Sequence, residues 1–297
     1  MILGYIGYGE AAYSMSCGFA ADGILKEQYA CSRKFADPNF VGFKPEDANC
    51  GRCITYEELF SKCDTVFVTT PNTAALATAQ KAAPYLHEGI LYVDMTSSNP
   101  KLMEQVAAVI EPTGALFVDG AMLDSLPKFK NKVPIVVAGP GAEELMKRIE
   151  GLGMNVDNVG TRPGAASAIK MLRSIYTKGH LGFALEMIEG AAYYGVDEYV
   201  MKSLAKTMDG KTFIQGMDGR MSGGILHAGR RAVELDMAAD MLDDAGLSSK
   251  VARAAADKLR EIDALHLPEK IGDYRPKTWK ESIDCIMKYK KEEEEQK

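Results

Sequence analysis

The chain has 297 residues, 46% of them hydrophobic and 26% charged, and its formal net charge at pH 7 is −6. This length is enough for one large domain or two smaller ones, each with its own core. The acidic balance, without a basic stripe, argues against a nucleic-acid partner. We find no apolar stretch near the ~20 residues that span a bilayer and no basic region that would begin a signal peptide. We therefore expect a soluble cytoplasmic protein without a membrane partner.

Six cysteines are present, and several fall in predicted strands or helices. This placement favours reduced cytosolic thiols over a disulfide framework. Cys50 and Cys53 have the spacing of half a zinc site, but no second Cys/His pair of suitable spacing follows them. We therefore expect no bound metal.

The first twenty residues predict a strand, a tight glycine turn and a helix. An apolar run, Ile2–Ile6, leads directly into Gly7, Gly9 and Ala12, which have the spacing G-x-G-x-x-A. The first glycine permits the turn, the second lets a pyrophosphate approach the backbone, and the alanine lets the helix lie close to the strand. Phosphates would then bind the free amides at the helix N-terminus. An ordinary glycine turn is the alternative to the predicted dinucleotide site, which comprises Gly7, Tyr8, Gly9, Glu10 and Ala11.

The end of the second predicted strand, Gln28–Cys31, indicates which dinucleotide binds. Ser32, Arg33 and Lys34 follow this strand, and residues 30–36 include no Asp or Glu. An acidic residue here would bind the ribose 2′-hydroxyl of NAD, whereas a small hydroxyl with basic neighbours suits the 2′-phosphate of NADP. The sequence therefore favours NADP over NAD, with a solvated basic turn as the alternative.

Strands alternate with helices up to about residue 160. We expect a loop at 37–55 and further strands at 64–70, 90–94, 116–119 and 133–138. This alternation predicts an α/β fold, a Rossmann-type doubly wound parallel sheet followed by an all-α domain. Ligands of such sheets bind outside the carboxyl ends of the strands, so we assign Thr69, Thr70, Pro71 and Thr96 to the cofactor site.

Strand signals vanish after residue 160, and Arg162-Pro163-Gly164 forms a hinge-like break. We therefore expect a dinucleotide-binding domain at 1–161 and an all-helical substrate and dimerisation domain at 162–297. The expected helices of the second domain cover 165–194, 197–208, 230–245, 249–263 and 278–290, with a glycine-rich interruption at 209–224.

The long helix that begins at Ala165 carries a polar row. Lys170, Arg173, Ser174 and Thr177 share one face, which lies against either solvent or a cleft. The same helix contains Gly179 and Gly182, each of which costs roughly 1 kcal/mol relative to alanine. We expect close neighbours to pack against these glycines.

Together these features resemble the β-hydroxyacid dehydrogenases, the family that includes 6-phosphogluconate and 3-hydroxyisobutyrate dehydrogenases. The resemblance rests on the initial glycine turn, the basic pair after strand two, Asp94–Pro100 as Asp-x-[Ser/Thr]-[Ser/Thr]-x-x-Pro, and the lysine on the first long helix. The segments Lys170–Gly179 and Arg230–Glu234 look more like a poorly characterised branch with a divergent helical domain.

The resemblance implies that Lys170 is the general acid/base. It would take the proton from the β-hydroxyl while hydride leaves for the nicotinamide. A dry cleft and a cationic neighbour such as Arg173 would favour the neutral amine. Alternatively, Lys170 only extends to the surface. Helical domains of this kind usually dimerise, so we expect a homodimer in which 209–224 reaches the neighbour's cleft.

The chain departs from the family pattern at the expected substrate loop. Leu123-Asp124-Ser125 replaces a Ser-Gly-Gly loop, Ser174 replaces an asparagine, and Val233 aligns loosely with a later lysine. Asp124 would repel a carboxylate, or bind a hydroxyl or amine instead. His227, Arg230 and Arg231 are candidate anion ligands, or alternatively a solvated helix start. The full set of candidate substrate-binding residues is Ser97, Leu123, Asp124, Ser125, Arg173, Ser174, His227, Arg230 and Arg231.

We therefore expect an NADP-dependent oxidoreductase that transfers a hydride between the nicotinamide and a small hydroxy or polyhydroxy acid or its oxo form. One alternative is an imine (C=N) reductase, which the lost Ser-Gly-Gly loop favours and the retained Lys170 disfavours. The other is a non-catalytic NADP-binding regulator.

Overall fold

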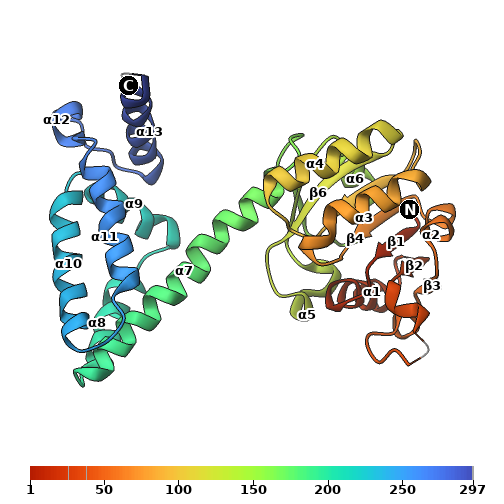
Figure 1. Cartoon of the computed structure of the whole chain (residues 1–297), viewed down its shortest axis with the longest axis horizontal. Helices are drawn as coiled ribbons and strands as arrows, with labels where there is room; N and C mark the ends of the chain where they lie inside the picture. The colour runs from red at the N-terminus through yellow and green to blue at the C-terminus, as the bar shows by residue number, and fades with distance from the viewer. Residues whose placement is uncertain (26, 38, 296–297) are drawn as a thin grey trace. The chain divides into compact units, whose positions relative to one another are not determined.

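An eight-stranded sheet lies at the centre of the N-terminal part of the chain (Figure 1). The computed structural model describes residues 1–25, 27–37 and 39–295. The chain divides into two compact units, Met1–Ile175 and Tyr176–Lys297. The predicted boundary between domains 1–161 and 162–297 stays a prediction, and the last two residues of the second range lie outside the described residues.

The strands follow the order β3-β2-β1-β4-β5-β6-β7-β8. Every residue of β1, β4 and β5 is buried, as expected of parallel strands that are covered on both faces. The order reverses at β1, which pairs with β2 on one side and β4 on the other. The strands are β1 Leu3–Ile6, β2 Gln28–Cys31, β3 Gly51–Cys53, β4 Thr65–Val68, β5 Leu91–Asp94, β6 Leu116–Met122, β7 Ile135–Ala138 and β8 Val156–Asn158.

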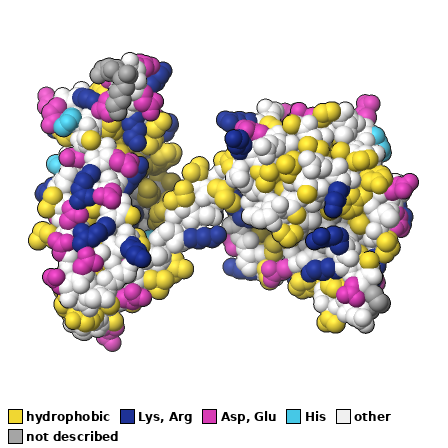
Figure 2. Space-filling model, in the orientation of Figure 1, with side chains coloured by type: hydrophobic (Ala, Val, Ile, Leu, Met, Phe, Trp, Pro, Cys, Tyr) yellow, Lys and Arg dark blue, Asp and Glu magenta, His cyan; other side chains and the backbone are white. Residues whose placement is uncertain are grey.

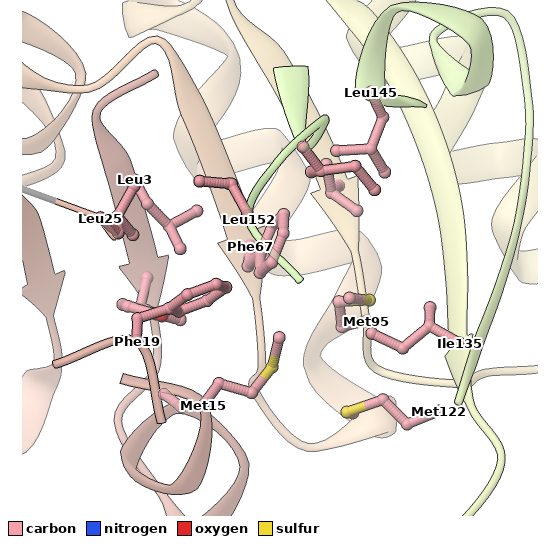
Figure 3. Close-up of a cluster of buried hydrophobic side chains, with 14 of the residues drawn as sticks. Leu3, Met15, Phe19, Leu25, Phe67, Met95, Met122, Ile135, Leu145 and Leu152 are labelled. Atoms are coloured by element: carbon pink, nitrogen blue, oxygen red, sulfur yellow. The ribbon is translucent and has the colours of Figure 1, made fainter. Parts of the chain in front are cut away.

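Helices cover both faces of this sheet. The helices of the first unit are α1 Glu10–Asp22, α2 Tyr56–Lys62, α3 Ala75–Ala82, α4 Pro100–Ile110, α5 Leu126–Phe129 and α6 Ala142–Arg148. Helices α1 and α6 bury their apolar faces in one core cluster, and α2, α3 and α4 bury theirs in another. Figure 3 shows the first cluster, where Met15 and Phe19 of α1 lie near Phe67 of β4. The predicted Rossmann-type α/β fold is confirmed.

Two details of the sheet differ from the sequence-based expectation. Strand β3 lies inside the predicted loop at 37–55, and its residues Gly51, Arg52 and Cys53 lack the β-branched side chains that signal a strand. Strand β7 runs antiparallel to β6. The four-residue helix α5 is only about 6 Å long, too short to carry the chain back along the sheet for a parallel pairing.

The second unit is helical. Helix α7, Ala165–Tyr193, begins in the first unit and continues into the second. It is followed by α8 Asp197–Met208, α9 Phe213–Gly224, α10 Ala228–Asp244, α11 Lys250–Asp263, α12 Leu267–Ile271 and α13 Trp279–Glu295. Within the described ranges, every helix falls short of the length and apolarity that crossing a membrane requires.

One expectation for the helical part is wrong, and another finds no support within this chain. Most of the predicted interruption at 209–224 forms α9, because Thr212 and Gln215 make a capping box that starts this helix despite its glycines. Gly179 and Gly182 also lack the close neighbours that we expected. Apart from the adjoining residues and backbone of the same helix, no described atom of this chain lies within 4 Å of a Cβ built on either glycine, so close packing there stays a prediction.

Candidate functional site

The glycine turn between β1 and α1 is built as its spacing predicts. Gly7 has φ +84°, and a Cβ there would lie 3.1 Å from the backbone nitrogen of Thr70. Only glycine fits this position without strain. Thr69 donates a hydrogen bond of 2.9 Å from its hydroxyl to the carbonyl of Gly7, which ties the turn to the end of β4. Gly9 is the N-cap of α1, with no described atom within 4 Å of a Cβ position. A ligand can therefore approach the first amides of α1.

A cavity of about 730 Å³ lies at this turn, at the ends of β1, β2 and β4. Its volume is in the range of small-molecule and cofactor sites. It brings together nine of the predicted cofactor residues: Gly7, Tyr8, Gly9, Ser32, Arg33, Lys34, Thr69, Thr70 and Pro71. The remaining predicted cofactor residues, Glu10, Ala11 and Thr96, are not among the residues that line it.

The chemistry of the cavity walls fits a phosphate-bearing dinucleotide. The buried hydroxyl of Thr70 has no hydrogen-bond partner among the described residues. Ser32 caps a short 3-10 helix, Arg33–Ala36, and accepts a hydrogen bond from the amide of Lys34 at 3.4 Å. Arg33 and Lys34 are exposed at the rim, which leaves two cations available to a phosphate.

Sequence reasoning missed several residues of the cavity wall. Four of them, Ala74, Ala77, Thr78 and Lys81, lie on one side of the segment that includes α3, with the i, i+3, i+4, i+7 spacing of a helix face. The spacing is visible in the sequence, but the strand order is needed to see that this helix face borders the cavity. The others are Ile6 and Cys31 at the ends of β1 and β2, Ile54 and Tyr56 after β3, and Thr73.

A second group of predicted residues meets beyond the end of β5. The Nζ atom of Lys170 on α7 donates to the Oγ atom of Ser97 at 2.9 Å. Ser97 is buried and has φ +56°, in the left-handed region that residues with side chains rarely adopt. The neighbouring Thr96 donates to the Oδ1 atom of Asp94 from its amide at 2.9 Å and from its hydroxyl at 2.6 Å. The structure thus joins the predicted residues Ser97 and Lys170, from distant parts of the sequence.

Two carboxyl groups are buried beside this group. Burial raises the pKa of Asp94 to about 6, against the opposing effect of its hydrogen bonds from Thr96. Burial also raises the pKa of Asp119, although Ser167 donates to it from both its amide and its hydroxyl. No group of three or more His, Cys, Asp or Glu side chains suited to a metal ion occurs in the described parts of the chain.

The residues of the predicted substrate loop, Leu123, Asp124 and Ser125, do not share one environment. Leu123 packs against a small apolar cluster that includes Val136 and Ala166. Asp124 is exposed and accepts a hydrogen bond of 2.7 Å from the amide of Ser125. On α7, Arg173 is exposed and Ser174 is half-buried.

The candidate anion ligands belong to the second unit. His227 is the exposed N-cap of α10. Arg230 pairs with Glu234 at 3.6 Å on the surface of that helix. The guanidinium of Arg231 lies 3.5 Å from a Cβ position on Gly223 of α9. The substrate roles of these three residues stay predictions.

Comparisons with known proteins agree with this architecture. Residues 4–150 match the model of the NAD-binding domain of 6-phosphogluconate dehydrogenase, and residues 191–262 match a domain of unknown function, DUF1932. An uncharacterized 28.5 kDa protein of Methanothermus fervidus is 28% identical over 239 residues, which cover 79% of this chain and 88% of that protein.

Three solved structures are similar over most of this chain. A conserved hypothetical protein of Sinorhizobium meliloti 1021 is 28% identical, with a TM-score of 0.62 and coverage of 97% of this chain and 96% of that one. A conserved protein of unknown function, described as structurally similar to 3-hydroxyacid dehydrogenases, is 26% identical, with a TM-score of 0.60 and coverage of 89% and 98%. An imine reductase from Myxococcus stipitatus, in complex with NADP+, is 18% identical, with a TM-score of 0.70 and coverage of 94% and 96%.

Proposed function

We propose that this protein is an NADP-dependent oxidoreductase acting on a small hydroxy or polyhydroxy acid or its oxo form, because residues 4–150 match the model of the NAD-binding domain of 6-phosphogluconate dehydrogenase. The observation that carries the proposal is the hydrogen bond from Lys170 to Ser97. It holds a group able to transfer a proton beyond the carboxyl end of β5, where ligands of such sheets bind.

The cavity at the glycine turn would hold the cofactor. The amides after Gly9 would bind the pyrophosphate, and Ser32, Arg33 and Lys34 would bind the 2′-phosphate of NADP. When bound, the nicotinamide supplies or accepts a hydride. The NADP+ complex of the imine reductase from Myxococcus stipitatus, which has the same fold, supports this preference.

Lys170 would serve as the proton-transferring group. In oxidation, its neutral amine takes the proton from the substrate hydroxyl while the carbon–oxygen double bond forms, and in reduction it returns that proton. Ser97 accepts a hydrogen bond from the lysine and so limits the directions in which Nζ can point. Arg173, Ser174 and the loop Leu123–Ser125 are proposed to surround the substrate. His227, Arg230 and Arg231 remain proposed anion ligands of a helical substrate domain, because arginine binds a carboxylate through two hydrogen bonds.

The test is turnover by the Lys170→Met variant on a panel of hydroxy acids with NADP+, followed by the absorbance of NADPH. Loss of general acid/base catalysis should lower kcat by roughly 10²–10⁴-fold and leave the Kd for NADPH unchanged. The control is Lys101→Met, because Lys101 is an exposed lysine of α4 outside the cavity lining. Retained turnover by Lys170→Met on a substrate that the wild type oxidises would overturn the assigned role.

Reduction of a C=N bond is the second candidate. The exposed carboxylate of Asp124 favours it, because a negative charge in the substrate loop suits an amine or iminium better than a carboxylate. NADPH oxidation on a panel of cyclic imines, without turnover of hydroxy acids, would support it. Tight NADPH binding without turnover on either panel would instead indicate a non-catalytic regulator.

We also propose that the protein is a cytoplasmic homodimer whose subunits meet along α7. Leu172 and Ile175 of this helix are 65% and 71% exposed. Figure 2 shows hydrophobic side chains along this helix. Within the second unit, an apolar cavity of about 320 Å³ is lined by residues including Phe183, Met187 and Tyr194. A second copy that covered these surfaces would remove a large apolar area from water. A monomer in light scattering at micromolar concentration would rule this out.

A further inference from the structure

Asp94 and Asp119 are fully buried and face each other across β5 and β6, as Cα partners in the sheet register. Neither lines the cofactor cavity. Burying two neighbouring carboxyl groups away from water costs free energy. Each of them accepts hydrogen bonds from a neighbouring residue, Thr96 for Asp94 and Ser167 for Asp119. The residues that donate to these carboxyl groups are close in sequence to the two partners of the Lys170–Ser97 hydrogen bond. Thr96 precedes Ser97, and Ser167 lies one helical turn before Lys170.

Asp94 positions Ser97, the acceptor of this hydrogen bond. Both of its hydrogen bonds, from the amide and the hydroxyl of Thr96, end on the single oxygen Oδ1. The Thr96 hydroxyl lies 3.1 Å from the hydroxyl of Ser98, which donates to the carbonyl of Asn72 at 3.0 Å. Ser97 lies between these two anchored residues in its left-handed conformation. The Asp94 carboxyl therefore fixes the turn from which Ser97 presents its Oγ atom.

Asp119 positions the helix segment that carries Lys170, the donor of this hydrogen bond. Its Oδ2 atom accepts from the amide of Ser167 at 2.9 Å, and its Oδ1 atom accepts from the Ser167 hydroxyl at 2.6 Å. Ser167 is fully buried in the first turn of α7, where amides lack partners within the helix. Lys170 follows three residues later, one turn along the helix and on the same side. Asp119 therefore fixes the position and rotation of the helix segment that carries the lysine.

We propose that Asp94 and Asp119 are positioning residues that together set the hydrogen bond between Lys170 and Ser97. Asp94 places the acceptor, and Asp119 places the donor. Each carboxyl group acts through the residues that it holds in place, so both are positioning residues and not catalytic ones. The catalytic importance of this arrangement rests on the proposed function of Lys170, but the geometry itself does not, so the two can be tested separately.

The test measures the reactivity of the Lys170 amine in the full-length protein. Trace labelling with acetic anhydride across a pH series, read by peptide mass spectrometry, compares Lys170 with the exposed Lys101 as internal reference. The variants are Asp94→Leu, Asp94→Asn, Asp119→Leu and Asp119→Asn. The control is Asp64→Leu, which removes a half-buried carboxyl that accepts a hydrogen bond from the amide of Ile2, next to β1 of the same sheet.

Both leucine variants should change the labelling rate of Lys170 relative to Lys101 by several-fold, and Asp64→Leu should leave this ratio unchanged. The asparagine variants should differ from each other. Asparagine at 94 retains the one oxygen that accepts both hydrogen bonds, so Asp94→Asn should restore the wild-type ratio. Asparagine at 119 retains only one of the two accepting oxygens, so Asp119→Asn should restore it in part.

An unchanged Lys170 ratio in both leucine variants, with only their melting temperatures lowered, would overturn the proposal and leave a purely structural role. If the leucine variants do not fold, Thr96→Val and Ser167→Ala remove the hydroxyl partners of Asp94 and Asp119, and the same criteria apply. Altered labelling combined with full turnover by Lys170→Met would uphold the positioning role and contradict the proposed function.

Discussion

The Nζ atom of Lys170 lies 2.9 Å from the Oγ atom of Ser97, although the two residues are 73 positions apart in the sequence. This contact links α7 to the turn after β5. Removal of the hydroxyl by Ser97→Ala keeps the side-chain volume nearly unchanged but leaves the lysine without this acceptor.

We expect Ser97→Ala to lower kcat by roughly 10–100-fold, because the Lys170 amine gains a positive charge as it takes the proton, and a hydrogen bond to a charged group contributes about 1.5–3 kcal/mol. The measurement is steady-state kinetics on the substrate found for the wild type. Ser61→Ala, a change in an exposed serine of α2, is the control and should keep wild-type kinetics. Equal kcat values for Ser97→Ala and the wild type would contradict a role of this hydrogen bond in catalysis.

Arg33→Ser should change the cofactor preference. Arg33 is an exposed cation on the wall of the cofactor cavity, where we place the 2′-phosphate. Its removal should weaken NADPH binding by about tenfold or more and affect NADH little, because only NADPH carries that phosphate. Titration of cofactor fluorescence gives both Kd values. Arg162→Ser, which removes an exposed arginine paired with Glu104, should change neither. Equal losses for the two cofactors would place the phosphate elsewhere.

Asp94 should make the stability of the protein fall as the pH rises. Burial raises its pKa from an ordinary value of 3.8 to about 6, and the neighbouring Asp119 adds to this. Between these two pH values the folded protein holds a proton that the unfolded chain has lost. The free energy of unfolding therefore decreases from about pH 4 to about pH 6, by on the order of 3 kcal/mol, and then levels off.

Asp94→Asn should reduce this decrease, because asparagine has no proton to lose and still accepts from Thr96. Urea unfolding at pH 4.5 and pH 7.5 gives the two free energies. Glu104→Gln, a change in an exposed carboxylate, is the control. The burial of Asp119 acts in the same direction, so part of the decrease should remain. An identical pH dependence in Asp94→Asn and the wild type would show that Asp94 is not its source.

Gly9, the N-cap of α1, and Gly18, within α1, should respond differently to alanine. A Cβ on Gly18 would overlap the side chain of Asn131 and lie 2.8 Å from its backbone nitrogen, so Gly18→Ala should destabilise the protein by roughly 1–3 kcal/mol. A Cβ on Gly9 meets no described atom within 4 Å, so Gly9→Ala should change stability by less than about 1 kcal/mol. The same methyl group would, however, lie where we place the pyrophosphate. NADPH affinity should therefore fall for Gly9→Ala and not for Gly18→Ala, as thermal melts with and without NADPH can show.

The glycine turn was predictable because its requirements are local. The conformation of Gly7, the start of α1 at Glu10 and the basic pair after β2 all follow from the spacing of neighbouring residues. Ser97 and Lys170 could be named as separate candidates, since each lies in a recognisable segment. Their hydrogen bond could not, because it depends on how the start of α7 is anchored to Asp119.

Other parts depended on information that the local pattern does not contain. The direction of β7 follows from the short reach of α5, and the place of Lys81 in the cavity wall follows from the strand order. Helix α9 was missed because its glycines lower helix propensity, whereas the capping box of Thr212 and Gln215 that starts it involves only two side chains.

The division of the chain at Ile175 has a consequence for how the activity is distributed. Lys170, Ser97 and the cofactor cavity all belong to the first unit, and the helical unit begins only at Tyr176. The proposed hydride and proton transfers therefore depend on one folded module. If His227, Arg230 and Arg231 bind the substrate as proposed, sequence change in the second module would alter which molecules are accepted without rebuilding the chemistry. A search for the substrate should accordingly vary the acid or amine freely and keep the cofactor fixed.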